Sequence, residues 1–142
     1  MSEAFVIQLE NNEVQRSLKE SPVKFKKGCL YGLRKAGQIV KADIQRSILL
    51  PKTGRKYAGL PNRSSAPGEA PANQSGTLRK SVTYKAYMWN FMEVGDEANY
   101  GGYLERGAKY LRPRPHISTA ASRTFNTVQM VVSMEIDKEL SK

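Results

Sequence analysis

The sequence predicts an α+β fold in which a small antiparallel sheet packs against two long amphipathic helices, with a long central loop. Two apolar stripes at helical spacing and two runs of alternating residues support this prediction. The chain has 142 residues, which suffice for one modest core and are too few for two ordinary domains. We therefore expect one domain over residues 1–142, with a flexible insertion at about 51–76.

The first element expected is a strand near the N-terminus. Every second residue across Phe5–Leu9 is apolar, which is the period of a strand with one buried face. We expect this strand to lie at a sheet edge and to be followed by a short helix carrying Val14 and Leu18. That helix should end before Pro22, because the residue preceding a proline disfavours helical angles.

A long helix is expected next. Gly28, Gly32 and Gly37 fall within it, and each glycine costs a helix about 1 kcal/mol relative to alanine. We therefore expect these glycines to permit close approach by another element. Apolar residues at steps of three or four define its buried stripe, namely Phe25, Cys29, Leu33, Ala36, Val40, Ile44 and Ile48.

The middle of the chain divides into a loop and a hairpin. Residues 51–76 are rich in proline, glycine, serine, asparagine and alanine and show no apolar periodicity. A loop of this length is typically functional or disordered, and we expect it to be disordered alone and ordered in an assembly. Leu78–Met88 alternates and is expected to be a strand, with Trp89–Val94 as its hairpin partner and the turn near Asn90.

A second long helix closes the predicted fold, and Ser118 or Thr119 can cap it. We expect its apolar stripe to pack against the stripe of the first long helix. The chain has one cysteine, so packing without an intrachain disulfide must hold the fold together. The stripe consists of Ala121, Phe125, Val128, Val132, Ile136 and Leu140.

Positive charge is the main compositional feature. The net charge of +10 favours an acidic partner such as DNA, an anionic membrane or an acidic protein surface. Six cations in and beside the central loop face a single acid, Glu69, and could contact DNA phosphates or an acidic protein, or merely keep the loop soluble. These cations are Lys52, Arg55, Lys56, Arg63, Arg79 and Lys80.

Groups capable of catalysis are few. His116 is the only histidine, and no acid or cysteine lies near it at the spacing of a metal site or an acid–base pair, so we expect a structural role. Cys29 is expected to act as a small buried hydrophobe. A group of carboxylates could bind metal or hydrolyse a substrate, but we favour a solvated acidic edge. These carboxylates belong to Glu93, Asp96, Glu97 and Glu105.

We expect neither secretion nor membrane insertion. The N-terminus has no basic start followed by an apolar run, and no segment approaches the ~20 apolar residues that a spanning helix needs.

The segment Tyr100–Ile117, with Ser75–Val82 ahead of it, is the most informative stretch of the chain. Three glycines, at 101, 102 and 107, should free the backbone, while Pro113 and Pro115 should stiffen its exit into an extended arm. Such a segment positions a surface and does no chemistry.

This stretch resembles the tail-component family of long-tailed phages, which comprises tail-completion, tail-terminator and head-to-tail joining proteins. Arg106, Ala108 and His116 depart from the family pattern, which usually has an aromatic, a threonine and a phenylalanine there. The residues that fit the pattern are Thr77, Leu78, Ser81, Tyr100, Tyr103, Glu105, Gly107, Arg114 and Pro115. Candidates for subunit contacts are Leu78, Ser81, Tyr103, Glu105, Gly107, Arg114 and Pro115.

The resemblance implies a structural protein and not an enzyme. It implies a homo-oligomeric ring, expected to be a hexamer, at the head-proximal end of the tail, made in the host bacterial cytoplasm and located in the virion tail or neck. Its partners would be the tail-tube protein, a head-closure or connector protein, and DNA passing through the ring, with no cofactor and no small-molecule substrate. A small basic nucleic-acid-binding domain using residues 52–80 is the alternative, whereas a hydrolase lacks a credible nucleophile and base.

Overall fold

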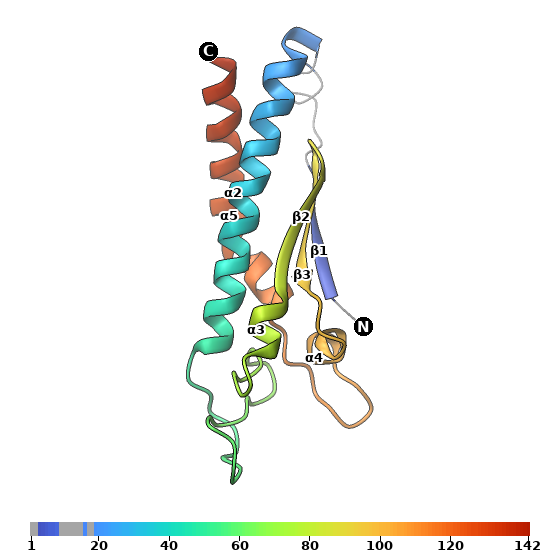
Figure 1. Cartoon of the computed structure of the whole chain (residues 1–142), viewed down its shortest axis with the longest axis vertical. Helices are drawn as coiled ribbons and strands as arrows, with labels where there is room; N and C mark the ends of the chain where they lie inside the picture. The colour runs from blue at the N-terminus through green and yellow to red at the C-terminus, as the bar shows by residue number, and fades with distance from the viewer. Residues whose placement is uncertain (1–2, 9–15, 17–18) are drawn as a thin grey trace.

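The computed structural model describes residues 3–8, 16 and 19–142 and has the predicted α+β architecture (Figure 1). The two long helices run antiparallel along the long axis of the molecule, and the sheet covers one side of them. Shorter helices and two irregular loops lie at the end opposite the C-terminus. In chain order the elements are β1 (Glu3–Gln8), α2 (Pro22–Leu49), α3 (Thr77–Ser81), β2 (Val82–Met88), β3 (Phe91–Asp96), α4 (Gly101–Arg106) and α5 (Ile117–Leu140).

Glycines allow α2 to pack closely against α5 and the sheet. A Cβ atom added to Gly32 would lie 2.8 Å from the Val132 Cα atom of α5, which is closer than real Cβ atoms approach. Gly28 meets the backbone of α5 in the same way, one helical turn earlier in α2. A Cβ atom on Gly37 would lie 2.6 Å from the Tyr84 ring of β2. The prediction that these glycines permit close approach is therefore confirmed.

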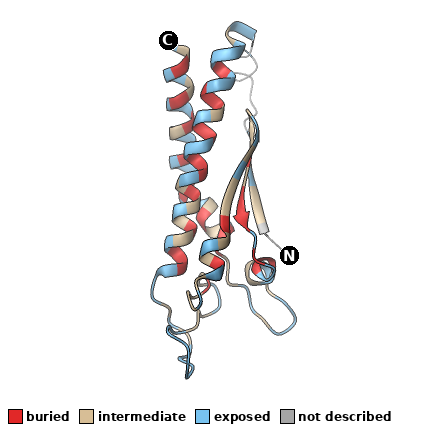
Figure 2. Ribbon diagram, viewed as in Figure 1, coloured by how far each residue is buried: buried red, intermediate tan, exposed pale blue. Residues whose placement is uncertain are grey.

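The sheet has three antiparallel strands in the order β1-β3-β2. The central strand β3 is therefore flanked by two edge strands, and β1 is one of them, as predicted. Trp89 and Asn90 form the turn between β2 and β3, and an irregularity between Ala86 and Met88 shifts the register beside it. Buried residues lie on the sheet face that meets the helices, whereas Val6 and Tyr87 on the other face are exposed (Figure 2).

Residues 78–81 are helical, so the prediction that a strand begins at Leu78 is wrong. Gly76 adopts a left-handed conformation, with φ at 82°, and the Ser75 hydroxyl accepts a hydrogen bond from the Thr77 amide. This local turn chemistry starts the short helix α3, which ends where Val82 takes an extended conformation. The alternating pattern indicates β2 correctly only from Val82 onwards.

Two of the three glycines in this segment do not free the backbone as predicted. Gly101 and Gly102 lie inside α4 and are buried, and a Cβ atom on Gly101 would overlap the Asp96 carboxylate. Steric space, not conformational freedom, therefore requires glycine at position 101. Gly107 does free the backbone as predicted, because it ends the helix with a φ of +85°, a conformation that favours glycine.

The buried face of α5 is rotated from the predicted stripe. Phe125 is 58% exposed, whereas Ala120 and Thr124 are buried and face the core together with Val128 and Val132. Phe125 instead borders an open groove between α5 and β1. The sequence misleads here because threonine can occupy a buried position when its hydroxyl is satisfied, and Thr124 donates to the Ala120 carbonyl at 2.7 Å.

Two predicted elements fall partly outside the described residues. Leu9, Val14 and Leu18 are among the residues that the structure does not describe. Ser21 separates the helical residue Glu20 from α2, and α2 begins at Pro22, which can take the first helical position because its missing amide hydrogen is not needed there.

The core is a layer of aliphatic side chains between the two long helices and the sheet, with Val40 at its centre and fully buried. Val40→Asp should lower the free energy of unfolding by about 4 kcal/mol or more, because an unpaired carboxylate would enter this layer. Urea melts followed by circular dichroism measure this loss. Gln38→Asp, an exposed site on the same helix, is the control and should change stability by less than about 1 kcal/mol. A Val40→Asp melt that matches the parent would contradict the core assignment.

Candidate functional site

The predicted site residues gather at the end of the molecule opposite the C-terminus (Figure 1). The loop of residues 51–76 leaves α2 there, and the arm of residues 107–115 connects α4 to α5 at the same end. A buried cluster of polar side chains lies where the arm enters α5. We describe this cluster first because it fixes the position of the arm.

Glu105 of α4 caps the N-terminus of α5. Its carboxylate accepts hydrogen bonds from the backbone amides of His116, Ile117 and Ser118, at distances of 2.8, 3.0 and 2.8 Å. These amides have no partner within the helix, and a negative charge is favoured beside them. Burial acts to raise the pKa of Glu105, but these hydrogen bonds, with that from the His116 side chain, hold it well below its usual range.

The His116 ring is completely buried between two carboxylates. Its Nε2 atom lies 2.8 Å from Oδ2 of Asp96, at the end of β3, and its Nδ1 atom lies 3.2 Å from Oε2 of Glu105. Burial acts to lower the pKa of His116, but the hydrogen bonds to Asp96 and Glu105 outweigh it and raise the pKa to about 9. The ring is therefore an imidazolium at neutral pH, and it can donate from both nitrogens.

The geometry of this cluster suits a structural role. The two carboxylates meet opposite nitrogens of one ring, so their lone pairs do not converge on a common point where a metal ion could sit. Among the described residues, no group of three or more histidine, cysteine, aspartate or glutamate side chains is placed to hold a metal ion. The side chains of His116 and Asp96 are 0% exposed, so neither can touch a substrate.

Two sequence interpretations are wrong here. Asp96 and Glu105 were expected on a solvated acidic edge, but Asp96 is buried and the carboxylate of Glu105 is only 8% exposed. No carboxylate was expected beside His116, yet the fold brings two to it. Of the four predicted edge acids, Glu97 does face solvent, where it pairs with Lys85 of the neighbouring strand at 3.1 Å.

The loop of residues 51–76 has no helix or strand, as predicted, and its turns are joined by hydrogen bonds. The Glu69 carboxylate accepts from the Thr53 amide, the Thr53 hydroxyl and the Ala66 amide. These hydrogen bonds lower the pKa of Glu69. They link the two sides of the loop across 16 residues of sequence. Disorder of this loop in the free chain remains a prediction.

The loop is attached to the arm. The Gly68 amide donates to the Pro113 carbonyl at 3.0 Å, and the Arg114 Nε atom donates to the Ser65 hydroxyl at 3.0 Å and to the Ser65 carbonyl at 3.2 Å. Arg114, expected to be a subunit contact, is therefore used within the chain. These bonds bring the central loop and the glycine-containing arm together as one surface.

Several basic residues of the loop serve its own fold. The Lys52 ammonium donates to the Ser47 carbonyl at the end of α2, and the Lys56 ammonium donates to the Leu60 carbonyl. Burial lowers the pKa of Lys52. Arg63 donates to the Gly54 carbonyl at 3.3 Å. Of the remaining predicted cations, Arg79 is partly buried, Lys80 is exposed, and Arg55 lies 5.3 Å from the centre of the Tyr57 ring.

Most of the predicted subunit-contact residues contribute to folding. Leu78 belongs to the core, and Ser81 donates to the Leu78 carbonyl at 2.7 Å. Gly107 forms the turn after α4, and Pro115 is half-buried in the arm. Tyr103 is the one aromatic among these residues, and it is 54% exposed. The motif therefore describes mainly how this end of the molecule is built.

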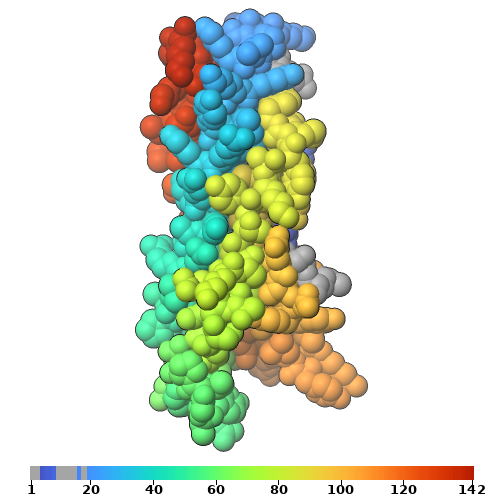
Figure 3. All heavy atoms as spheres, viewed as in Figure 1, coloured from blue at the N-terminus to red at the C-terminus, as the bar shows by residue number. Residues whose placement is uncertain are grey.

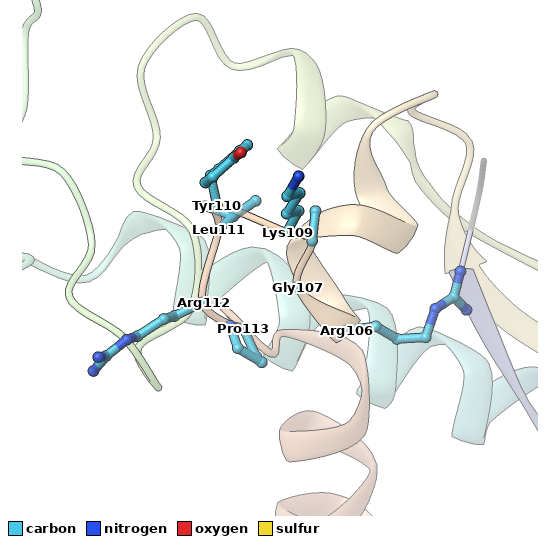
Figure 4. A pocket seen from close by; sticks show the side chains of 8 residues that line it. Arg106, Gly107, Lys109, Tyr110, Leu111, Arg112 and Pro113 are labelled. Carbon is cyan, nitrogen blue, oxygen red and sulfur yellow. The ribbon is translucent and has the colours of Figure 1, made fainter.

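The arm carries a small hairpin that the sequence did not predict (Figure 4). Ala108 and Leu111 exchange backbone hydrogen bonds of 2.8 and 3.1 Å around a turn made by Lys109 and Tyr110. Tyr110 is 90% exposed, and the Lys109 ammonium lies 5.2 Å from the centre of its ring. A shallow hollow of about 600 Å³ lies within residues 106–113.

Compared with models of protein families, with curated proteins and with solved structures, the chain gives no significant match. Within the described part of the chain, no helix combines the length and the apolar character needed to cross a bilayer.

Replacing the capping carboxylate should destabilise the fold. Glu105→Ala should lower the free energy of unfolding by about 2 kcal/mol or more, because the first amides of α5 lose their acceptor and the imidazolium loses a counter-charge. Denaturant melts provide the measurement. Glu97→Ala, which removes an exposed ion pair, is the control and should cost less than about 1 kcal/mol. Equal losses in the two variants would contradict the capping role.

Stability should decrease in alkaline solution because of His116. The unfolded chain releases this proton near pH 6.5 and the folded chain near pH 9, so its stabilisation is complete below pH 6.5 and is lost as pH rises to about 9. The contribution of Glu105 to stability changes with pH in the opposite direction. It is complete above the ordinary pKa of 4.5 and is lost as pH falls. Urea melts between pH 5 and 9 should show the His116 effect, and melts below pH 4.5 should show the Glu105 effect. His116→Gln should flatten the alkaline decrease, and an unchanged slope would show that His116 is neutral.

Proposed function

We propose that this chain is a structural subunit of a phage tail, which forms or joins a ring at the head-proximal end. The proposal rests on where residues of the phage-like pattern lie in the structure. Several of them lie at the junction where α4, the arm and α5 meet. Glu105 and Gly107 end α4, and Arg114 and Pro115 form the arm that leads to α5. The part of the pattern between residues 100 and 115 thus maps onto a single junction, as a shared scaffold would require.

The sheet offers a route to assembly. Both β1 and β2 are edge strands among the described residues, so each has a side whose backbone groups no strand of the chain covers. Pairing of β2 in one subunit with β1 in the next would extend the sheet between subunits. Such a head-to-tail contact closes into a ring if the rotation between subunits allows it, and we expect six subunits.

Exposed apolar side chains accompany the β2 edge. Tyr87 is 57% exposed and Met88 is 58% exposed, and both lie near the turn that joins β2 to β3. In an assembled ring these side chains would be covered by a neighbouring subunit. The tail-tube protein and a head-closure or connector protein would then bind the two faces of the ring.

The proposed role is non-enzymatic. The only histidine is enclosed with its two carboxylate partners and serves to hold the arm. The alternative, a monomeric nucleic-acid-binding domain, accounts for the positive charge but gives no role to the two open sheet edges.

Assembly should depend on the β2 edge. The double variant Tyr87→Lys, Met88→Lys should abolish ring formation and incorporation into tails, because two charges would be buried without partners at the contact. Sedimentation velocity and electron microscopy of tails formed with each protein measure the effect. Met134→Lys, at a 61% exposed site on α5, is the control and should assemble normally. Gold-labelled antibodies should locate the parent protein in the neck or upper tail of the virion, and its absence from both would overturn the proposal.

A further inference from the structure

The cations at the loop end of the molecule fall into two groups. Lys52, Lys56, Arg63 and Arg114 donate to oxygens of the chain itself. Among the described residues, a second group has exposed side chains that no hydrogen bond or ion pair holds, and the partly buried Arg79 belongs to neither group. The second group, which we call the free cations, consists of Arg55, Lys80, Lys109 and Arg112.

The free cations lie on segments that the fold gathers at one end. Arg55 belongs to the central loop, Lys80 to α3, and Lys109 and Arg112 to the hairpin of the arm. The loop and the arm are joined through Gly68 and Pro113, so their charges share one end of the molecule (Figure 3). Lys109 and Arg112 point away from the hairpin in different directions (Figure 4).

The acidic side chains of the loop and of the α4 end of the arm form no ion pair with the free cations. Glu69 is the only acid within residues 51–76, and residues 106–115 contain no acid. Glu105 comes immediately before the second of these ranges. The Glu69 oxygens accept hydrogen bonds from Thr53 and Ala66, and the Glu105 oxygens accept those from the start of α5. The free cations therefore produce a positive potential that extends into solvent.

We propose that the free cations form a binding surface for the phosphate backbone of duplex DNA. Phosphates are spaced along a duplex and are contacted by separated lysine and arginine side chains, and the loop and the hairpin carry such separated cations. An acidic protein partner would instead need an apolar, charge-depleted centre of contact. Tyr57 of the central loop and Tyr110 of the hairpin are exposed, and each lies beside a cation of its own segment, so these two rings do not form a stacked series of the kind that binds single strands.

This surface extends beyond residues 52–80, because Lys109 and Arg112 come from the arm. It also goes beyond the proposed assembly role, since binding can be measured whatever the oligomeric state of the chain. The contacts are to phosphates only, so the binding should be independent of base sequence.

Fluorescence anisotropy with a labelled 20-base-pair duplex of mixed sequence tests the proposal on the full-length protein. Each phosphate contact contributes a slope of about −0.9 to the plot of log affinity against log salt concentration, so four contacts should give about −3.6. The double variant Lys109→Gln, Arg112→Gln should weaken binding at low salt by about tenfold or more and reduce the slope by about 1.8. The charge-preserving variant Lys109→Arg, Arg112→Lys should bind like the parent.

The matched control is Lys24→Gln, Lys138→Gln, which removes the same charge from exposed sites near the opposite end of the two long helices. At 0.1 M salt, the low-salt condition for both double variants, it should reduce affinity by less than about threefold, because charges beyond a Debye length of about 10 Å are then largely screened. A loss as large as that of the hairpin variant would overturn the proposal, since only net charge would then matter. Tighter binding to the single strand of the same sequence, or displacement of the duplex by an equal charge of polyglutamate, would also overturn it.

Discussion

The buried imidazolium of His116 connects the central strand, α4 and the start of α5. Asp96 comes from the end of the central strand, Glu105 from the last turn of α4, and His116 itself precedes α5. Two carboxylates would repel each other in a buried site, and a cation between them removes that repulsion. This arrangement holds the start of α5 against β3 and α4.

This arrangement explains why the end of the molecule carries so many short, irregular elements. Gly101 leaves room for the Asp96 carboxylate, and Gly107 turns the chain so that the arm can return towards α4. The Arg114 amide then donates to the Leu104 carbonyl, which holds the arm against the helix before His116 enters its site. The loop of residues 51–76 attaches to the outside of the arm. A polar centre thus organises one end, while an aliphatic core organises the rest.

The long-range periodic features of the sequence were sufficient to predict the α+β class, both long helices, the hairpin and the edge position of β1. Local chemistry was harder to predict. Helix α3 depends on a left-handed glycine and a serine hydroxyl over a few residues, and the alternating pattern gave no sign of it. The His116 cluster joins residues 20 and 11 positions apart, so no spacing rule could indicate it. Phe125 was misplaced because apolar character alone does not determine which face of a helix is buried.

The distribution of charge along the molecule has a consequence for symmetry. The free cations and the loop lie at one end of the two long helices, and the C-terminus lies at the other. Subunits related by rotation about a single axis keep the same orientation relative to that axis, so the symmetry of a closed ring would not exchange its two faces. Such a ring is a directional object with two chemically different faces. In the proposed ring, a partner on one face would therefore meet a different surface from a partner on the other.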